Sequence, residues 1–85
     1  MNDFPEWWDW ELVFVDHFYE RAEERGITEL EVRAMLERPK GLERNHEEGR
    51  FVVHVRHRRS PWYVIVEPNF VLKELRVLTA YPRER

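Results

Sequence analysis

Three side chains that could bind or transform an anion recur at every fourth position of one segment. His17, Arg21 and Arg25 have this spacing. On a helix, four positions advance only about 40° around the axis, so the three side chains form one stripe, and Phe18 and Ala22 form an apolar stripe beside it. A guanidinium stays charged at any working pH, and an imidazole can exchange a proton near neutrality. The helix could therefore hold a phosphate group and move a proton beside it.

The segment that carries this stripe has the start and stop signals of two helices separated by a glycine. Gly26 can adopt the positive φ that commonly ends a helix. Thr28 and Glu31 have the spacing of a capping box, which marks the start of a second helix. Pro39 disfavours α geometry at the residue before it and stops that helix. We therefore expect a helix–Gly–helix unit over residues 16–39.

Four strands are predicted around the two helices. The first is apolar on both faces, as in a strand that is covered on both sides. The other three follow one another through short connections, which implies antiparallel pairing. The predicted strands are Trp10–Val15, Arg50–Arg58, Trp62–Glu67 and Leu75–Tyr81. The order β-α-α-β-β-β predicts an α+β fold, with an antiparallel sheet and the helical hairpin on one of its faces.

Two connections carry weaker signals. Residues 40–49 are polar and include two glycines, so we expect a loop there. The last hairpin could turn at Pro68–Asn69 or near Lys73–Glu74, and the sequence leaves both positions open.

Alternation along the strands assigns side chains to two faces of the sheet. We expect the face that the helices leave open to carry Arg50, His54, Arg56 and Arg58. A cationic face with a histidine suits RNA, because arginine neutralises phosphate and imidazole can transfer a proton. The alternative interpretation is the ordinary alternation of a half-solvated strand. In the last strand, the two expected faces are Leu75, Val77, Thr79 and Tyr81, and Arg76, Leu78 and Ala80.

Length, composition and charge bound the class of protein. The 85 residues suit one small domain, which we divide into a Trp-rich arm (1–9), an α+β domain (10–82) and a tail (83–85). Trp7 and Trp8 of the arm should cover an end of the core, or else a partner interface. Residues 1–49 carry a net charge of −8 and residues 50–85 a net charge of +5. The basic half could face an anion and the acidic half a basic partner, or the halves could pair with each other.

Several kinds of site and location are disfavoured. The chain has no cysteine, which excludes disulfides and thiolate metal sites and is compatible with the cytoplasm. No apolar run approaches the length of a membrane span, and the acidic N-terminus does not resemble a signal peptide. His54 and His57 lie three positions apart on a strand and so point to opposite faces, and His46 has no partner motif. We therefore expect no metal, no cofactor and no nucleophilic side chain.

The helix and the closing strand together resemble a known family. The pattern His17-x-x-x-Arg21-x-x-x-Arg25-Gly26-Ile27, followed by Thr79-x-Tyr81 near the end, resembles a widespread family of small prokaryotic domains of unknown function. That family is grouped with the RelE/ParE and BrnT-like toxins, in the barnase–colicin–RelE assemblage of metal-independent ribonucleases. The resemblance covers roughly residues 10–82.

The resemblance implies a RelE-like, toxin-like ribonuclease and its partners. It assigns catalysis to His17, Arg21 and Tyr81. Substrate contacts fall to Arg25 and Thr79 by resemblance, and to His54 and Arg56 by their place on the basic strand. The implied partners are RNA and an antitoxin-like protein, and a homodimer is a candidate assembly. The rival hypothesis is a non-catalytic module that binds protein or RNA, in which His17 caps its helix, the arginines pair with neighbouring carboxylates and Tyr81 packs on a helix.

Overall fold

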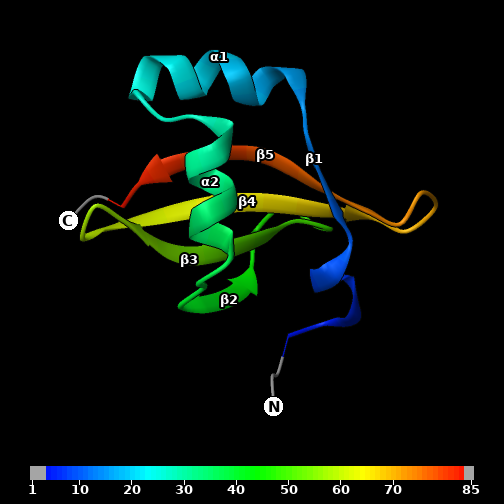
Figure 1. The fold of residues 1–85 in the computed structure, drawn as a ribbon. Helices are drawn as coiled ribbons and strands as arrows, with labels where there is room; N and C mark the ends of the chain where they lie inside the picture. Colours follow the sequence, from blue (N-terminus) through cyan, green and yellow to red (C-terminus); the bar gives the residue numbers. More distant parts are fainter. Residues whose placement is uncertain (1–3, 84–85) are drawn as a thin grey trace.

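The computed structural model describes residues 4–83, in which five strands form one sheet with the order β1-β5-β4-β3-β2 (Figure 1). A short 3₁₀ helix, η1 (Glu6–Asp9), precedes the sheet, and two α-helices follow the first strand. The remaining elements are β1 (Glu11–Phe14), α1 (Asp16–Arg25), α2 (Glu29–Leu36), β2 (Gly41–Arg44), β3 (Phe51–His57), β4 (Ser60–Asn69) and β5 (Glu74–Pro82). Parts of the predicted arm (residues 1–3) and tail (residues 84–85) lie outside the described residues.

The predicted α+β class, with both helices on one face of the sheet, is confirmed. Antiparallel pairing holds from β2 through β5, but β1 pairs parallel with the first half of β5, so the sheet is mixed. Local patterns predict the strand but not its direction, because β1 reaches β5 only after the whole chain has folded back.

The loop expected at residues 40–49 is wrong in its first half. Gly41–Arg44 forms β2, which pairs antiparallel with β3. The strand lies at the edge of the sheet, where a strand is often short and charged. Such a strand lacks the apolar alternation that reveals a strand in sequence, so its composition resembled that of a loop.

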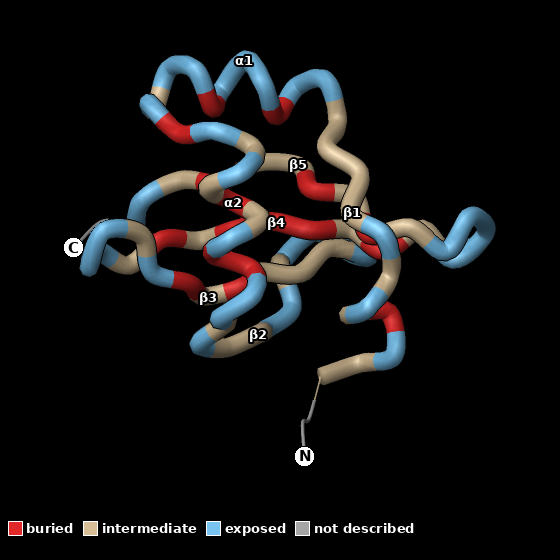
Figure 2. Tube along the Cα trace, in the orientation of Figure 1, coloured by how far each residue is buried: buried red, intermediate tan, exposed pale blue. Residues whose placement is uncertain are grey.

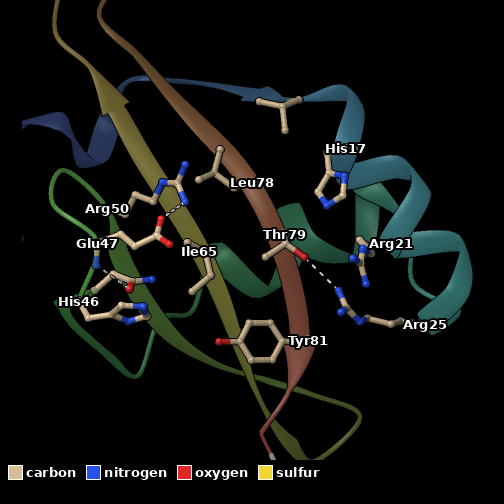
Figure 3. Close-up of a pocket in the computed structure, with 12 residues that line it drawn as sticks. His17, Arg21, Arg25, His46, Glu47, Arg50, Ile65, Leu78, Thr79 and Tyr81 are labelled. Carbon is tan, nitrogen blue, oxygen red and sulfur yellow. Dashed lines mark hydrogen bonds and ion pairs between the residues drawn. The ribbon is translucent and has the colours of Figure 1, made fainter.

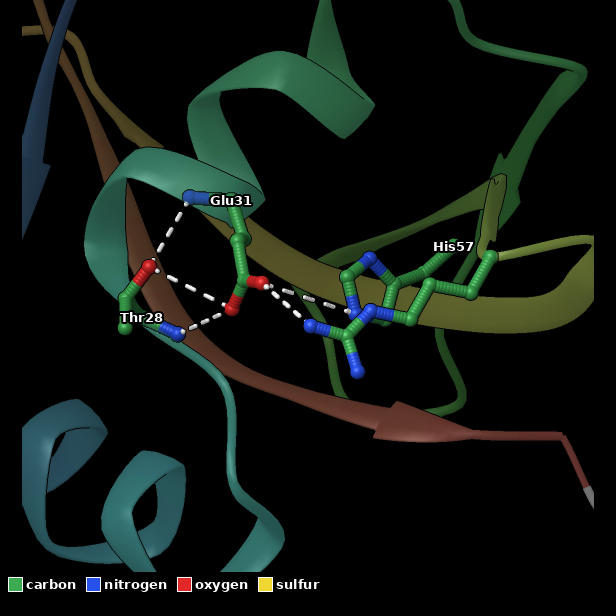
Figure 4. Close-up of polar contacts among 4 residues, drawn as sticks. Thr28, Glu31 and His57 are labelled. Atoms are coloured by element: carbon green, nitrogen blue, oxygen red, sulfur yellow. Dashed lines mark hydrogen bonds and ion pairs between the residues drawn. The ribbon is translucent and has the colours of Figure 1, made fainter.

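The helix–Gly–helix prediction is confirmed. Gly26 ends α1 with φ 68° in the left-handed region. The Thr28 hydroxyl accepts a hydrogen bond from the Glu31 amide, and the Glu31 carboxylate accepts one from the Thr28 amide, which completes the capping box at α2 (Figure 4). The helices run in different directions over the sheet: α1 contacts β5 and α2 contacts β3 (Figure 1).

The core lies between the helices and the sheet (Figure 2). Phe18 and Ala22 anchor α1 in it, as their shared stripe predicts. Trp7 is 4% exposed and its ring lies 4.8 Å from that of Phe51, so η1 covers an end of the core. The other buried side chains of the core come from the connection between the helices, α2 and the three central strands: Ile27, Val32, Met35, Leu36, Val53, Val55, Trp62, Val64, Val66, Leu75, Val77 and Ala80. No helix of residues 4–83 has the length and apolarity that crossing a membrane requires.

The last hairpin turns between the two positions left open by the sequence. β4 continues through Pro68 to Asn69, and β5 begins at Glu74. The Asn69 side-chain oxygen accepts hydrogen bonds from the amides of Val71 and Leu72, which shapes the turn over residues 70–73.

A register shift opposite Ile65 and Val66 corrects the predicted faces of the last strand. Ile65 pairs with Thr79 and Val66 pairs with Val77, so Leu78 is an extra residue on β5. The alternation changes phase there: Leu75, Val77 and Ala80 are buried in the core. Thr79 and Tyr81 therefore lie on the open face of the sheet, and their predicted grouping with Leu75 and Val77 is wrong.

Candidate functional site

An open cleft of about 540 Å³ lies beside α1 on the open face of the sheet (Figure 3). One wall is the polar side of α1, the floor is β4 and β5, and the other wall is the connection from β2 to β3. The side chains that line it are Val15, His17, Arg21, Arg25, Asn45, His46, Glu47, Arg50, Ile65, Leu78, Thr79 and Tyr81. All of the residues that the resemblance assigned to the site are among them.

The basic side chains on the α1 wall make only long contacts with neighbouring carboxylates. Nδ1 of His17 lies 3.7 Å from Oε1 of Glu20, and the His17 side chain is 60% exposed. Nη1 of Arg21 lies 3.9 Å from Oε1 of Glu24, and the Arg21 side chain is 47% exposed. Exposed ion pairs of this length contribute little to stability. Both side chains can therefore turn to a ligand at small cost.

Arg25, the third residue of the stripe, is held against β5 by hydrogen bonds. Its Nη1 donates a hydrogen bond to Oγ1 of Thr79 at 3.0 Å (Figure 3). The same nitrogen donates a second bond to the carbonyl oxygen of Ala80 at 3.1 Å. β1 pairs only as far as Val77, so beyond that residue the edge of β5 opposite β4 has α1 rather than a strand beside it. The Arg25 guanidinium carbon lies 5.7 Å from the centre of the Tyr81 ring. No carboxylate in the described residues forms an ion pair with Arg25, so its charge remains available to the cleft.

The opposite wall contains residues that were not predicted for the site. His46 and Asn45 come from the polar connection, and the Asn45 side chain accepts a hydrogen bond from the Glu47 amide at 3.1 Å. Arg50 forms an ion pair with Glu47, and its Nε lies 3.8 Å from Oε2 of Glu67. Sequence reasoning missed His46 because it considered metal motifs alone. A histidine in the polar loop directly before the basic strand was the available signal.

The other predicted substrate residues lie outside the cleft. His54 and Arg56 line a separate depression of about 350 Å³, and Nε2 of His54 lies 3.1 Å from Oε2 of Glu43. Arg58, expected on the open face, instead lies in the turn after β3, and its Nη2 contacts Oε2 of Glu31 on α2 at 3.3 Å. That expectation is wrong because β3 ends at His57.

A row of rings nevertheless connects His54 with the cleft. The His54 and Tyr63 ring centres lie 5.0 Å apart, and those of Tyr63 and Tyr81 lie 5.6 Å apart. The row crosses β3, β4 and β5 on the open face. Within residues 4–83, no group of three or more His, Asp or Glu side chains could hold a metal ion.

Comparison with known proteins gives a family for the chain. Residues 14–85 match the model of a family described as "Domain of unknown function (DUF4258)". No curated protein and no solved structure matches the sequence. The predicted link to the RelE/ParE and BrnT-like toxins stays a prediction. Because the matched segment covers most of the chain and the whole cleft, this protein belongs to the DUF4258 family.

Proposed function

We propose that the cleft binds single-stranded RNA and cleaves its backbone, as a toxin-like endoribonuclease. The observation that carries this proposal is the meeting of the α1 stripe with Tyr81 of β5 in one open cleft. These residues are more than 50 positions apart in sequence, and they combine a histidine, arginines and a phenol. His17 and Arg21 make only long, exposed contacts with Glu20 and Glu24, so both side chains remain accessible from the cleft.

The lining of the cleft suits a nucleotide. Arg21 and Arg25 lie on one wall and would present positive charge to a phosphate in the cleft. On the other wall, the charge of Arg50 is shared with Glu47 and Glu67. Ile65 and Leu78 offer an apolar floor, and the Tyr81 ring offers a face on which a base can stack. The volume of about 540 Å³ falls within the range of small-molecule sites.

The proposed chemistry is transfer at phosphorus. The 2′-oxygen of the RNA attacks the adjacent phosphorus, the bond from phosphorus to the 5′-oxygen breaks, and a 2′,3′-cyclic phosphate and a 5′-hydroxyl form. One group must accept the 2′-hydroxyl proton and another must donate a proton to the leaving oxygen. We assign these steps to His17 and His46 on the two walls, and the orientation of the 2′-hydroxyl to Tyr81. Arg21 and Arg25 stabilise the charge that develops on the phosphoryl oxygens.

The cellular role in this proposal is that of a toxin whose antitoxin-like partner covers the cleft. The cytoplasm, which contains the RNA, is the corresponding location. Expression of the protein alone should then inhibit growth, and the partner should restore it.

The experiment compares RNA with its 2′-deoxy counterpart, with and without ribosomes. Purified protein should cut labelled RNA in EDTA and leave a cyclic phosphate on one fragment and a 5′-hydroxyl on the other. The deoxy strand should bind and remain intact, because it lacks the attacking oxygen. If RNA stays intact under both conditions and expression is harmless, the protein is a non-catalytic binder and the proposal is wrong.

A further inference from the structure

The turn between β3 and β4 is built from two residues that the local geometry disfavours. His57 pairs with Ser60, so Arg58 and Arg59 form a two-residue hairpin loop. Their φ angles are 54° and 70°, both in the left-handed region. Such a loop favours Asn-Gly, because side chains with a Cβ are strained there. Arg58 has a stabilising contact, with Glu31 on α2, but Arg59 has no ion pair within the described residues. A strained position without such a contact suggests a function.

This turn borders a depression of about 520 Å³ beside the end of α2. Arg38, Lys40, Arg56 and Arg59 line it, and we call these four residues the basic corner. Two carboxylates, Glu31 and Glu37, also line it. Glu31 is already engaged by Arg58 and by the Thr28 cap, so Glu37 remains against the four basic side chains. No ion pair with a carboxylate of residues 4–83 involves any residue of the basic corner. The end of the α2 dipole could account for Arg38, but not for arginines on a strand and a turn.

The basic corner is continuous with the cleft. Lys40 and Arg56 also line the depression that contains His54 and Tyr63. The Tyr63 ring contacts Tyr81, which lines the cleft. A row of three rings, Tyr81, Tyr63 and His54, therefore lies between the cations of the cleft and those of the basic corner. Rings flanked by cations match a single strand of nucleic acid, which has bases to stack and phosphates to neutralise, better than they match an acidic polypeptide.

We propose that the basic corner is a second RNA site, which holds phosphates of the strand as it leaves the cleft over Tyr63 and His54. This inference rests on the proposed RNA function of the cleft. It extends the substrate from a dinucleotide to a single strand of several nucleotides, and the backbone contacts of the corner require no particular base sequence. The strain at Arg59 is then retained because the residue binds RNA.

Arg59→Gly gives a sharp test, because glycine relieves the strain and removes one charge. Lys73→Gly is a matched control: Lys73 also has a positive φ, of 55°, is exposed, and lies in the other hairpin turn. Both variants should unfold at a higher urea concentration than the wild type. Only Arg59→Gly should weaken binding of an RNA of about 12 nucleotides, and lower the slope of log K against log salt by about 0.7.

An RNA of about four nucleotides separates this inference from the function of the cleft. Both RNAs carry 2′-O-methyl groups for binding measurements, so that they stay intact. The short RNA should bind the wild type and both variants equally.

If the wild type binds neither RNA at low salt, the function of the cleft itself is wrong. If the short RNA binds but Arg59→Gly and Lys73→Gly bind the long RNA alike, the second site is wrong and the cleft stands. If Arg59→Gly loses binding of polyglutamate but not of the long RNA, the corner recognises acidic protein and the inference is overturned.

Discussion

The two helices use their polar residues in opposite ways. α2 begins at a complete capping box, and its Arg33 contacts Glu29 at 2.9 Å. α1 follows Val15 and has no side-chain cap, and the ion pairs of His17 and Arg21 are at least 3.7 Å long. Both helices bury their apolar stripes equally well. Polar residues of α2 therefore stabilise the fold, whereas His17 and Arg21 of α1 make only long, exposed contacts.

The lowered pKa values of Glu29 and Glu31 on α2 agree with this difference between the helices. The backbone amide of Thr28 is the main cause that lowers the pKa of Glu31, and His57 and Arg58 add to it. A hydrogen bond from the Tyr19 hydroxyl, at 2.7 Å, is the main cause that lowers the pKa of Glu29, followed by one from Arg33. These carboxylates are stabilised as anions by groups of the fold itself.

The largest expected effect on stability concerns the burial of apolar side chains, which both helices share. Phe18→Ala should lower the free energy of unfolding by about 3–5 kcal/mol, because it leaves a cavity under α1. Leu30→Ala on α2, where the side chain is 76% exposed, should change it by less than about 0.5 kcal/mol. Urea melts of both variants provide the measurement. A Phe18→Ala variant as stable as Leu30→Ala would mean that α1 is not anchored in the core.

A smaller effect is expected at the start of α2. Thr28→Ala removes the acceptor for the Glu31 amide and should cost about 1 kcal/mol in urea unfolding. Thr28→Ser keeps the hydroxyl and should remain close to the wild type. Cleavage of RNA should not change in either variant, since residue 28 does not line the cleft. A loss of cleavage in a stably folded Thr28→Ala variant would break the division between the helices.

The smallest effect is a pH dependence at Glu31. Its pKa is lowered in the fold, so its contribution to stability is complete above the ordinary value of 4.5 and is lost as pH falls through the lowered value. The difference in unfolding midpoint between the wild type and Glu31→Gln should therefore shrink below pH 4.5. Thermal melts from pH 7 downward would detect it. A difference that grows on acidification would contradict the assigned direction.

The features that the sequence predicted are those with local signals. Gly26, Thr28 and Glu31 act within a few residues of one another. The first helix ends at Gly26 and the second begins at the Thr28–Glu31 capping box, as these residues predict. The apolar alternation of β3 and β4 is equally local, and both strands form.

The features that the sequence missed depend on distant partners. β2 becomes a strand because β3 pairs with it, and the parallel direction of β1 depends on β5 at the far end of the chain. The extra residue Leu78 exists only in the pairing of β4 with β5. That shift reversed the predicted faces of Thr79 and Tyr81, although the motif had correctly grouped these residues with the α1 stripe.

The assignment of catalysis to α1 is tested by measuring RNA cleavage and stability in matched variants of the two helices. Arg21 and Arg33 are 47% and 42% exposed, and each pairs with a glutamate on its own helix. We predict that Arg21→Ala, like His17→Ala and Tyr81→Phe, slows single-turnover RNA cleavage by roughly 100-fold or more without changing the urea midpoint. Arg33→Ala should lower the midpoint slightly and cleave like the wild type. Equal cleavage rates in Arg21→Ala and Arg33→Ala would contradict the claim that α1 forms the active site.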